Sequence, residues 1–196
     1  MNKAFLTDIV GEISSIMQEN KEYLVELDAR NGDGDLGLSM SNGFSAIYKY
    51  LQDSQETDLG RALMKCSSVF NETAPSTLGT IVSICLMGMA RSLKGKTDAT
   101  LAETARALTA GIENIMEKAG SKPGEKTILD AIHPAAMALA DHVDQGRAEA
   151  TRLALKAAES GMESTRNMKS VHGRAAYYGE KSIGLVDGGA VAGMLI

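Results

Sequence analysis

Apolar residues recur at helical spacing along most of the chain. The clearest face advances in steps of three and four residues and consists of Leu101, Ala105, Leu108, Ile112, Ile115 and Ala119. This spacing predicts a helix that begins at Asp98 and ends near Gly120, because residues three and four apart share one helical face. Shorter faces of the same kind are Ile9, Ile13 and Ile16, then Ile132, Ala136, Leu139 and Val143, and less regularly Leu153, Ala157 and Met162. No stretch alternates with period two, so the pattern predicts no strand.

Clusters of Gly, Pro, Asn and Asp divide the chain into segments between which helices must end. The segments predict eight helices at residues 3–27, 38–52, 58–70, 76–94, 98–119, 127–144, 147–168 and after Gly188. Short connections force neighbouring helices to run antiparallel, so the expected fold is all-α, an up-and-down helical bundle or barrel. The chain contains no linker-like segment and no repeat, and residues 1–196 are expected to form a single domain.

The composition supports a helical globular chain. Of the 196 residues, 44% are hydrophobic and 4% aromatic, and there is no Trp, a mix that favours helices over sheets. The 20 basic and 25 acidic residues give a net charge of −5. That balance leaves no global field to attract nucleic acid or an anionic membrane surface. Neither is therefore expected as a partner.

The sequence also predicts the compartment and the state of the thiols. The strongly apolar run at 78–90 is too short to cross about 30 Å of hydrocarbon, and residues 1–10 lack the pattern of a secretion signal. A cytoplasmic protein is expected. Cys66 and Cys85 lie in apolar periodic stretches without metal-ligand spacing, so buried free thiols are favoured over a disulfide or a zinc site.

The loop at residues 27–37 carries an unusual concentration of acid. Asp28, Asp33 and Asp35 stand within eight residues, with Arg30 as the nearby cation. The glycines between and after these residues let the backbone fold so that the carboxylates converge. Converging carboxylates repel one another, and a bound hard cation would relieve the repulsion.

Two other interpretations of this loop are an EF-hand and a solvated acidic turn. An EF-hand loop starting at Asn31 fails on register, because Leu36 falls where a Gly is required and Asn42 where the bidentate Glu is required. A solvated acidic turn without an ion remains the simpler alternative. If a cation does bind, oxygen ligands with incomplete coordination suit Mg²⁺, which keeps positions open for water and phosphate oxygens.

A second loop, at residues 179–190, precedes the last helix. Asp187 is a good N-cap residue, and Gly188 and Gly189 expose backbone N–H groups where a helix start favours an anion. Ordinary capping explains the same residues. Arg174 could add a guanidinium to a phosphate, although a lone Arg is usually a surface residue.

A third candidate is the segment 73–77, before the apolar helix that continues at Leu78. It offers hydroxyl groups at another helix N-terminus. A plain N-cap with Pro in the first turn explains it equally well.

Three ordered motifs give these loops a family resemblance. The family pattern L-D-x-x-I-G-D-x-D-H-G is matched by residues 27–37, and K-x-x-P-G-D-K-T-x-x-D resembles 122–127 with Asp130. The pattern G-R-A-x-Y-x-G-E-R-S-I-G-H-Q-D-P-G-A is similar to 173–184 followed by 187–190. Over essentially its full length the chain resembles the L subunit of dihydroxyacetone kinase, the DhaL or DAK2-type nucleotide-binding domain.

The resemblance implies an eight-helix antiparallel barrel whose loops at one end hold ADP or ATP through two Mg²⁺ ions. It assigns Asp28, Asp33 and Asp35 as the metal ligands. The residues expected to contact the nucleotide are Leu36, Gly37, Leu38, Ser39, Thr73, Ala74, Ile128, Arg174, Asp187, Gly188 and Gly189.

The resemblance also implies a division of labour between subunits. The ketose, dihydroxyacetone or a related short ketose, would sit on a separate K-type subunit, and this chain would supply no catalytic general base. The nucleotide would be rephosphorylated in place by a phosphohistidine protein (an M-type subunit of a phosphotransferase system) or exchanged as ATP. Phosphoryl transfer needs positioning and charge neutralisation, which a metal site and an Arg can supply.

Some positions depart from the family pattern. Leu36 replaces a His, Leu185-Val186 replaces His-Gln, and Asn71–Pro75 replaces the phosphate loop G-G-A-S-G. Glu72 in that segment would oppose a nearby phosphate, whereas Thr73 or Ser76 could replace the lost hydroxyl. An alternative function is therefore a non-catalytic regulatory paralogue that senses a nucleotide and docks to a partner protein.

Overall fold

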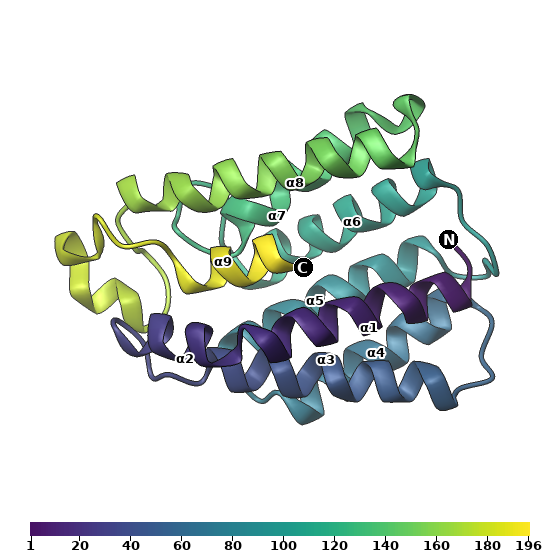
Figure 1. Ribbon diagram of the computed structural model, residues 1–196, viewed down its shortest axis with the longest axis horizontal. Coiled ribbons are helices and arrows are strands. Elements are labelled where there is room, and N and C mark those ends of the chain that lie inside the picture. Colours follow the sequence, from purple (N-terminus) through teal and green to yellow (C-terminus); the bar gives the residue numbers. More distant parts are fainter.

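The computed structural model describes all 196 residues and contains helices but no strand (Figure 1). The α-helices are α1 (Lys3–Glu19), α2 (Lys21–Ala29), α3 (Leu36–Asp53), α4 (Leu59–Thr73), α5 (Thr77–Ser92), α6 (Leu101–Ala119), α7 (Leu129–Asp141), α8 (Arg147–Ser164) and α9 (Gly188–Leu195). Three short 3₁₀ segments are η1 (Val143–Gln145), η2 (Thr165–Asn167) and η3 (Arg174–Ser182). The predicted all-α class is confirmed, with nine α-helices in place of eight.

The additional helix arises because the predicted helix at 3–27 is divided at Asn20. The backbone of Asn20 (φ −95°, ψ 7°) leaves the α-helical region. Its backbone N–H and its side-chain amide both donate to the carbonyl of Ile16, at 3.0 and 2.8 Å, so the side chain caps the end of α1. The chain bends there and α2 begins at Lys21.

The predicted start of the helix at Asp98 is also wrong. Helix α6 is capped by Thr100, whose hydroxyl accepts from the N–H of Glu103 while the Glu103 carboxylate accepts from the N–H of Thr100. This reciprocal capping box fixes the helix start two residues later than the spacing suggested. Asp98 instead pairs with the N-terminal amine at 3.3 Å.

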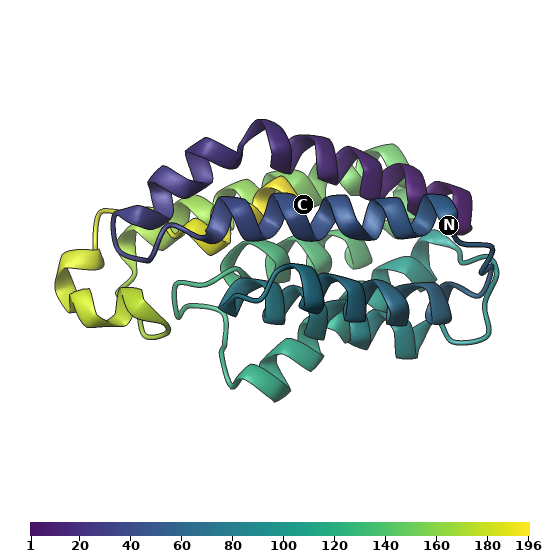
Figure 2. The ribbon, with the colours of Figure 1, turned by 90° about the horizontal axis from the view of Figure 1, so that it is seen from below.

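The helices form a ring in which sequence neighbours run antiparallel, except that α2 continues in the direction of α1 (Figures 1 and 2). Helices α1, α3, α4, α5, α6, α7 and α8 follow one another round it. Helix α9 lies between the α7–α8 pair and the α1 and α2 helices, and completes the ring. Because neighbours alternate in direction, the loops gather at the two ends, and the N-terminus lies at the end opposite η3 (Figure 1).

The tertiary arrangement selects which face of α1 is buried. The core side of this helix consists of Leu6, Val10, Ser14 and Met17. Ile9, Ile13 and Ile16, which share a helical face as their spacing predicts, lie beside this core side and are only half-buried. In α6, by contrast, Ala105, Ile112 and Ile115 of the predicted face are buried.

Helices α7 and α8 approach closely at Gly161. Pro134 lies inside α7 and has no N–H to offer the carbonyl of Asp130, four residues earlier. A Cβ added at Gly161 would lie 1.9 Å from that carbonyl oxygen and 2.9 Å from Cγ of Pro134. Only glycine therefore lets α8 lie against this part of α7.

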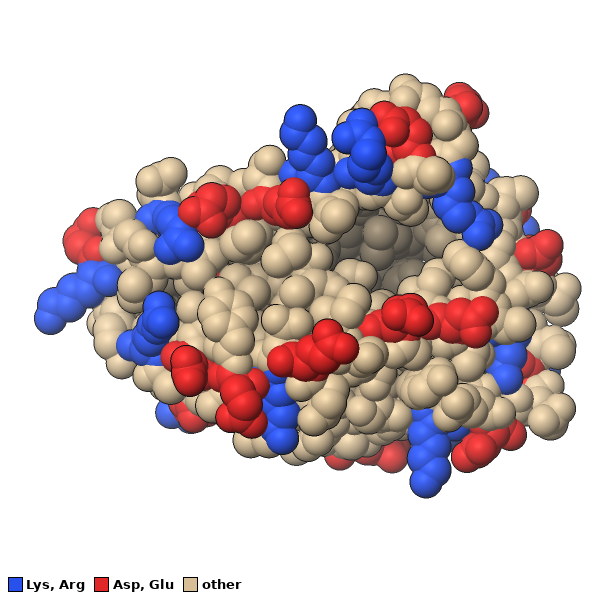
Figure 3. Space-filling model, viewed as in Figure 1, with Lys and Arg blue, Asp and Glu red and all other residues tan.

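Charged side chains of both signs lie over the face seen in Figure 3. The same view shows a hollow lined by uncharged residues between α1 and α8, beside the C-terminal end of α9. None of the helices combines the length and the apolar character needed to cross a bilayer. Both cysteines are free thiols, and burial raises the pKa of each to about 12.

Candidate functional site

A cavity of about 840 Å³ opens at the end of the ring where α2, α4, α6 and α8 finish. Five segments line it, at residues 28–36, 71–81, 119–128, 172–175 and 187–189. The cavity therefore collects the acidic loop, the start of α5, the α6–α7 connection and both parts of the C-terminal loop. These are the three loops singled out in the sequence, together with the motif around residues 122–127.

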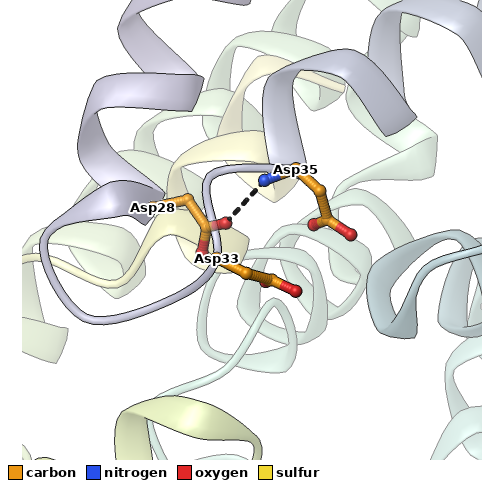
Figure 4. A group of neighbouring side chains, drawn as sticks. All are labelled: Asp28, Asp33 and Asp35. Carbon is orange, nitrogen blue, oxygen red and sulfur yellow. Dashed lines mark hydrogen bonds between the residues drawn. The ribbon is translucent and has the colours of Figure 1, made fainter.

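The three predicted metal ligands converge on one side of this cavity (Figure 4). Asp28 lies in the last turn of α2, Asp33 on the loop and Asp35 immediately before α3. A carboxylate oxygen from each lies within 4.8 Å of the others. The Asp28 carboxylate also accepts from the backbone N–H of Asp35 at 3.1 Å, which closes the loop. A Cβ at Gly32 would lie 2.1 Å from Oδ1 of Asp28, so the loop requires glycine at that position.

The electrostatics of this cluster favour a cation. Burial, and then the charges of Asp33 and Asp28, raise the pKa of Asp35, while Arg174 acts in the opposite direction. Arg174 forms an ion pair with Asp33, with 2.9 Å between Nη2 and Oδ2. The cluster offers only oxygen ligands, which is the donor set that Mg²⁺ and Ca²⁺ prefer. The residues present therefore fit a divalent cation.

Two helix N-termini also line the cavity. Helix α5 is capped by Ser76, whose hydroxyl accepts from the N–H of Gly79, and α9 is capped by Asp187, whose carboxylate accepts from the N–H of Ala190. The first N–H groups of a helix have no intrahelical partner and carry the positive end of the helix dipole. The aspartate cluster and these helix N-termini together can hold a ligand that combines a cation with phosphate groups.

Asp187 is itself held in an unusual state. The residue is half-buried at the cavity wall, and the burial of its carboxyl group raises its pKa to about 6, against the opposing effects of the hydrogen bond from the N–H of Ala190 and of the Lys126 charge. Its backbone N–H donates to the hydroxyl of Thr165 at 3.0 Å. These contacts fix the start of α9 against the end of α8.

Most of the predicted site residues line the cavity. They are the three aspartates together with Leu36, Ile128, Arg174, Asp187, Gly188 and Gly189. Residues as far apart in the chain as Asp28 and Gly189 are thus brought to one place. The regularity of the ring explains this, because alternate loops must meet at the same end.

The other predicted nucleotide contacts, Gly37, Leu38, Ser39, Thr73 and Ala74, do not line the cavity. Gly37 is a packing residue, since a Cβ there would lie 2.1 Å from the carbonyl of Lys21 on α2. The hydroxyl of Thr73 donates to the carbonyl of Val69 at 2.8 Å. Nucleotide contact by these residues stays a prediction.

The departures from the family pattern have a structural consequence. Leu36 and Val186 are each 7% exposed and belong to the main hydrophobic core; Leu36 also lines the cavity, whereas Val186 does not. In the altered segment, Asn71 and Pro75 line the cavity, whereas Glu72 does not. Glu72 is therefore not placed to repel a phosphate in the cavity, contrary to the expectation from the sequence.

Sequence reasoning missed two residues at this site. Lys126 is buried and donates from Nζ to four backbone carbonyls of the C-terminal loop. His172 also lines the cavity, and its Nε2 lies 2.6 Å from Oε2 of Glu125. The P-G-E-K-T run around Lys126 was the available signal, but its partners lie far along the chain.

An all-helical ring with an acidic cluster and helix N-termini facing one cavity defines a protein suited to bind a metal–phosphate ligand. A family model described as "DAK2 domain" matches residues 30–196. The chain belongs to this family.

Named relatives extend the comparison. The ADP-binding subunit DhaL of the PEP-dependent dihydroxyacetone kinase of Escherichia coli (strain K12) is 30% identical over 198 residues, covering 100% of this chain and 94% of the relative. The triokinase/FMN cyclase of Mus musculus is 32% identical over 191 residues, which is 96% of this chain but 33% of that protein. The crystal structure of the dihydroxyacetone kinase from C. freundii in complex with AMP-PNP and Mg²⁺ matches with a TM-score of 0.77 at 23% identity, over 98% of this chain and 32% of that one. This structural likeness establishes the fold.

Proposed function

We propose that this chain is the nucleotide-bearing L-type subunit of a dihydroxyacetone-type kinase. The observation that carries the proposal is the single cavity into which three converging carboxylates, an arginine and two helix N-termini all face. A nucleoside diphosphate or triphosphate with its cations has the matching charges. The relatives named as ADP-binding subunits of dihydroxyacetone kinase support the same assignment.

In this proposal Asp28, Asp33 and Asp35 hold two Mg²⁺ ions, which would supply neutralisation of the phosphate charge when bound. The start of α9, at Gly188 and Gly189, donates backbone N–H groups to phosphate oxygens. Arg174 adds a planar guanidinium that can contact a phosphate through two N–H groups.

The nucleoside part of the ligand would lie against the less polar wall. Leu36 and Ile128 line the cavity and are almost fully buried, so each offers a small apolar surface at its floor. Ala74 is also buried, behind the start of α5. A purine ring gains free energy when it leaves water for such a surface.

The phosphoryl acceptor belongs to another protein in this proposal. The cavity contains no Lys with a free amine, since all donors of the Lys126 ammonium are engaged with carbonyls. His172 is paired with Glu125. A ketose such as dihydroxyacetone would therefore sit on a K-type subunit, and the phosphoryl group would cross the interface at this end of the ring. The donor would be a phosphohistidine protein of a phosphotransferase system (an M-type subunit), with ATP as the second possibility.

A reconstitution assay tests the proposal. The purified chain is analysed for bound ADP and mixed with the K-type subunit of a dihydroxyacetone kinase, first with ATP and separately with a phosphohistidine donor. We expect turnover of dihydroxyacetone only when both subunits are present. Asp35→Ala should abolish turnover in either format. Turnover by the isolated chain would contradict the division of labour, and nucleotide binding without turnover in any mixture would favour a regulatory paralogue.

A further inference from the structure

Residues 165–187 form a projecting loop that connects α8 to α9 (Figure 2). Its helical part is the 3₁₀ segment η3, which is interrupted at Gly179 (φ 53°, ψ −127°). The loop carries His172 and Arg174 to the cavity. A long loop of this kind holds a fixed position only where its two ends are joined.

The two ends meet in a neck, defined here as residues 165–168 on one side and 182–187 on the other. The N–H of Gly184 donates to the carbonyl of Arg166 at 2.7 Å. The N–H of Asp187 donates to the hydroxyl of Thr165 at 3.0 Å. These bonds hold the two sides of the neck together. They do not connect the neck to the part of the ring formed by α6 and α7.

Lys126 supplies that connection from the α6–α7 loop. Its Nζ lies 2.9 Å from the carbonyl of Thr165 and 3.1 Å from that of Met168, on the first side of the neck. On the second side it lies 2.6 Å from the carbonyls of both Ser182 and Leu185. Hydrogen bonds from a charged donor are stronger than neutral ones. One ammonium group therefore joins both sides of the neck to the helical ring.

These contacts leave Lys126 no donor for a ligand. A lysine ammonium has three N–H groups, and four carbonyl oxygens already surround this one. The residue is 3% exposed although it borders the cavity. Its action on a bound phosphate must then be indirect, through the loop that it holds.

The backbone at this position supports the same role. Lys126 is the only residue other than glycine with a positive φ, at 61°. The carboxylate of Asp130 fixes the surrounding turn by accepting from the N–H groups of Gly124 and Thr127. A left-handed conformation is unfavourable for a residue with a side chain, and it persists where the surroundings determine it.

We propose that Lys126 is a positioning residue that fixes the loop 169–181 over the cavity and thereby places Arg174 at the ligand. The contacts of Lys126 carry the inferred position of the loop by themselves, whereas the effect on a ligand rests on the proposed function.

Hydrogen–deuterium exchange tests the first part. Lys126→Met keeps the length of the side chain and removes its donors. The amides of Ser170, Gly184 and Asp187 donate to the Ser182 hydroxyl, the Arg166 carbonyl and the Thr165 hydroxyl. They should exchange about tenfold faster or more, while the amides of α3 and α5 keep their protection. The matched control is Lys156→Met on the exposed surface of α8, which should leave the loop unchanged. Unchanged exchange in the Lys126→Met loop would overturn the proposal, as would a uniform loss of protection over every helix.

Calorimetry with ADP and Mg²⁺ tests the second part. Lys126→Met and Arg174→Ala should each lower the affinity for ADP about tenfold or more. The double variant should bind ADP about as well as the single variant with the lower affinity, because both changes act through one loop. Lys126→Arg retains charged donors and should recover part of the affinity. Additive losses in the double variant would overturn a role through Arg174. If the wild-type chain binds no ADP at all, the proposed function fails while the exchange result still decides the role of Lys126.

Discussion

The guanidinium of Arg174 lies 2.9 Å from the carboxylate of Asp33, across the mouth of the cavity. The side chains are 68% and 40% exposed, and an exposed ion pair contributes at most about 1 kcal/mol to stability. The pair joins the C-terminal loop to the acidic loop. It also means that a cation and Arg174 compete for the Asp33 carboxylate.

This competition predicts that Arg174→Ala has opposite effects on the binding of a metal ion alone and on the binding of ADP with Mg²⁺. In Arg174→Ala, Mg²⁺ or Mn²⁺ alone should bind up to about thirtyfold more tightly, because the repulsion between a divalent ion and a unit positive charge about 4 Å away is about 2 kcal/mol in water. ADP with Mg²⁺ should bind about 10–100-fold more weakly, because a charge-assisted contact to phosphate is lost. Titration calorimetry measures both. Arg152→Ala, which removes an exposed pair with Glu149 on α8, should change neither, and a metal affinity that falls in Arg174→Ala would contradict the competition.

Asp35→Ala separates binding from stability. Asp35 precedes α3 but makes no side-chain capping hydrogen bond, and its neighbours raise its pKa by repulsion. Without metal, the free energy of unfolding should therefore be unchanged or slightly higher, whereas ADP should no longer be retained. Urea unfolding and calorimetry give the two quantities.

Asp58→Ala provides the reverse case. The Asp58 carboxylate caps α4 by accepting from the N–H of Arg61 and lies away from the cavity. Its removal should lower the free energy of unfolding and leave ADP affinity unchanged. If Asp35→Ala and Asp58→Ala both lose ADP binding, or if both keep it, the assignment of the acidic loop to the nucleotide site is contradicted.

The buried carboxyl of Asp187 predicts a pH dependence of stability. Its pKa is raised from 3.8 to about 6 in the folded chain, so between these values the folded state holds a proton that the unfolded state has lost. The free energy of unfolding should fall as the pH rises through this window, by up to about 3 kcal/mol. In Asp187→Asn, which keeps a capping oxygen, this fall should be much smaller. Urea unfolding at pH 4, 5, 6 and 7 without metal tests the difference, and parallel curves for the two proteins would refute the assignment.

Gly161→Ala tests the contact between α7 and α8. Ala is the better helix former by about 1 kcal/mol, but its Cβ would overlap the carbonyl of Asp130, at 1.9 Å. The substitution should destabilise the chain by about 1–3 kcal/mol, as overpacking does. The exposed neighbour Ser160→Ala should stay within about 0.5 kcal/mol of wild type. Thermal unfolding distinguishes the two, and a stabilised Gly161→Ala would show that α8 can move away from α7.

Several features could be predicted because they depend on neighbours along the chain. Helical spacing and breaker residues identified every helix except the division at Asn20, and the ends of most agree within a few residues. Asp187 was predicted as an N-cap, which it is. Three aspartates separated by glycines could also be expected to converge, because the loop that holds them is only a few residues long.

The sequence could not determine which apolar side of α1 faces the core. The apolar face of α1 is wider than the surface that packs against its neighbouring helices. The packing therefore buries Leu6, Val10 and Met17 and leaves the isoleucines half-buried. The same applies to Asp98, where a capping box two residues later competes successfully for the helix start.

Other features were decided only by the tertiary structure, because their partners are distant in the chain. The four carbonyls around Lys126 lie 39 to 59 residues away, and no local pattern indicates which backbone groups a buried ammonium will meet. The pairing of Arg174 with Asp33 likewise exists only because the ring brings alternate loops to one end. The sequence by itself determined the helices and the chemistry of the loops. The packing of the ring determined which loop residues meet, because hydrogen bonds and ion pairs act over a few ångströms in space, whatever the separation along the chain.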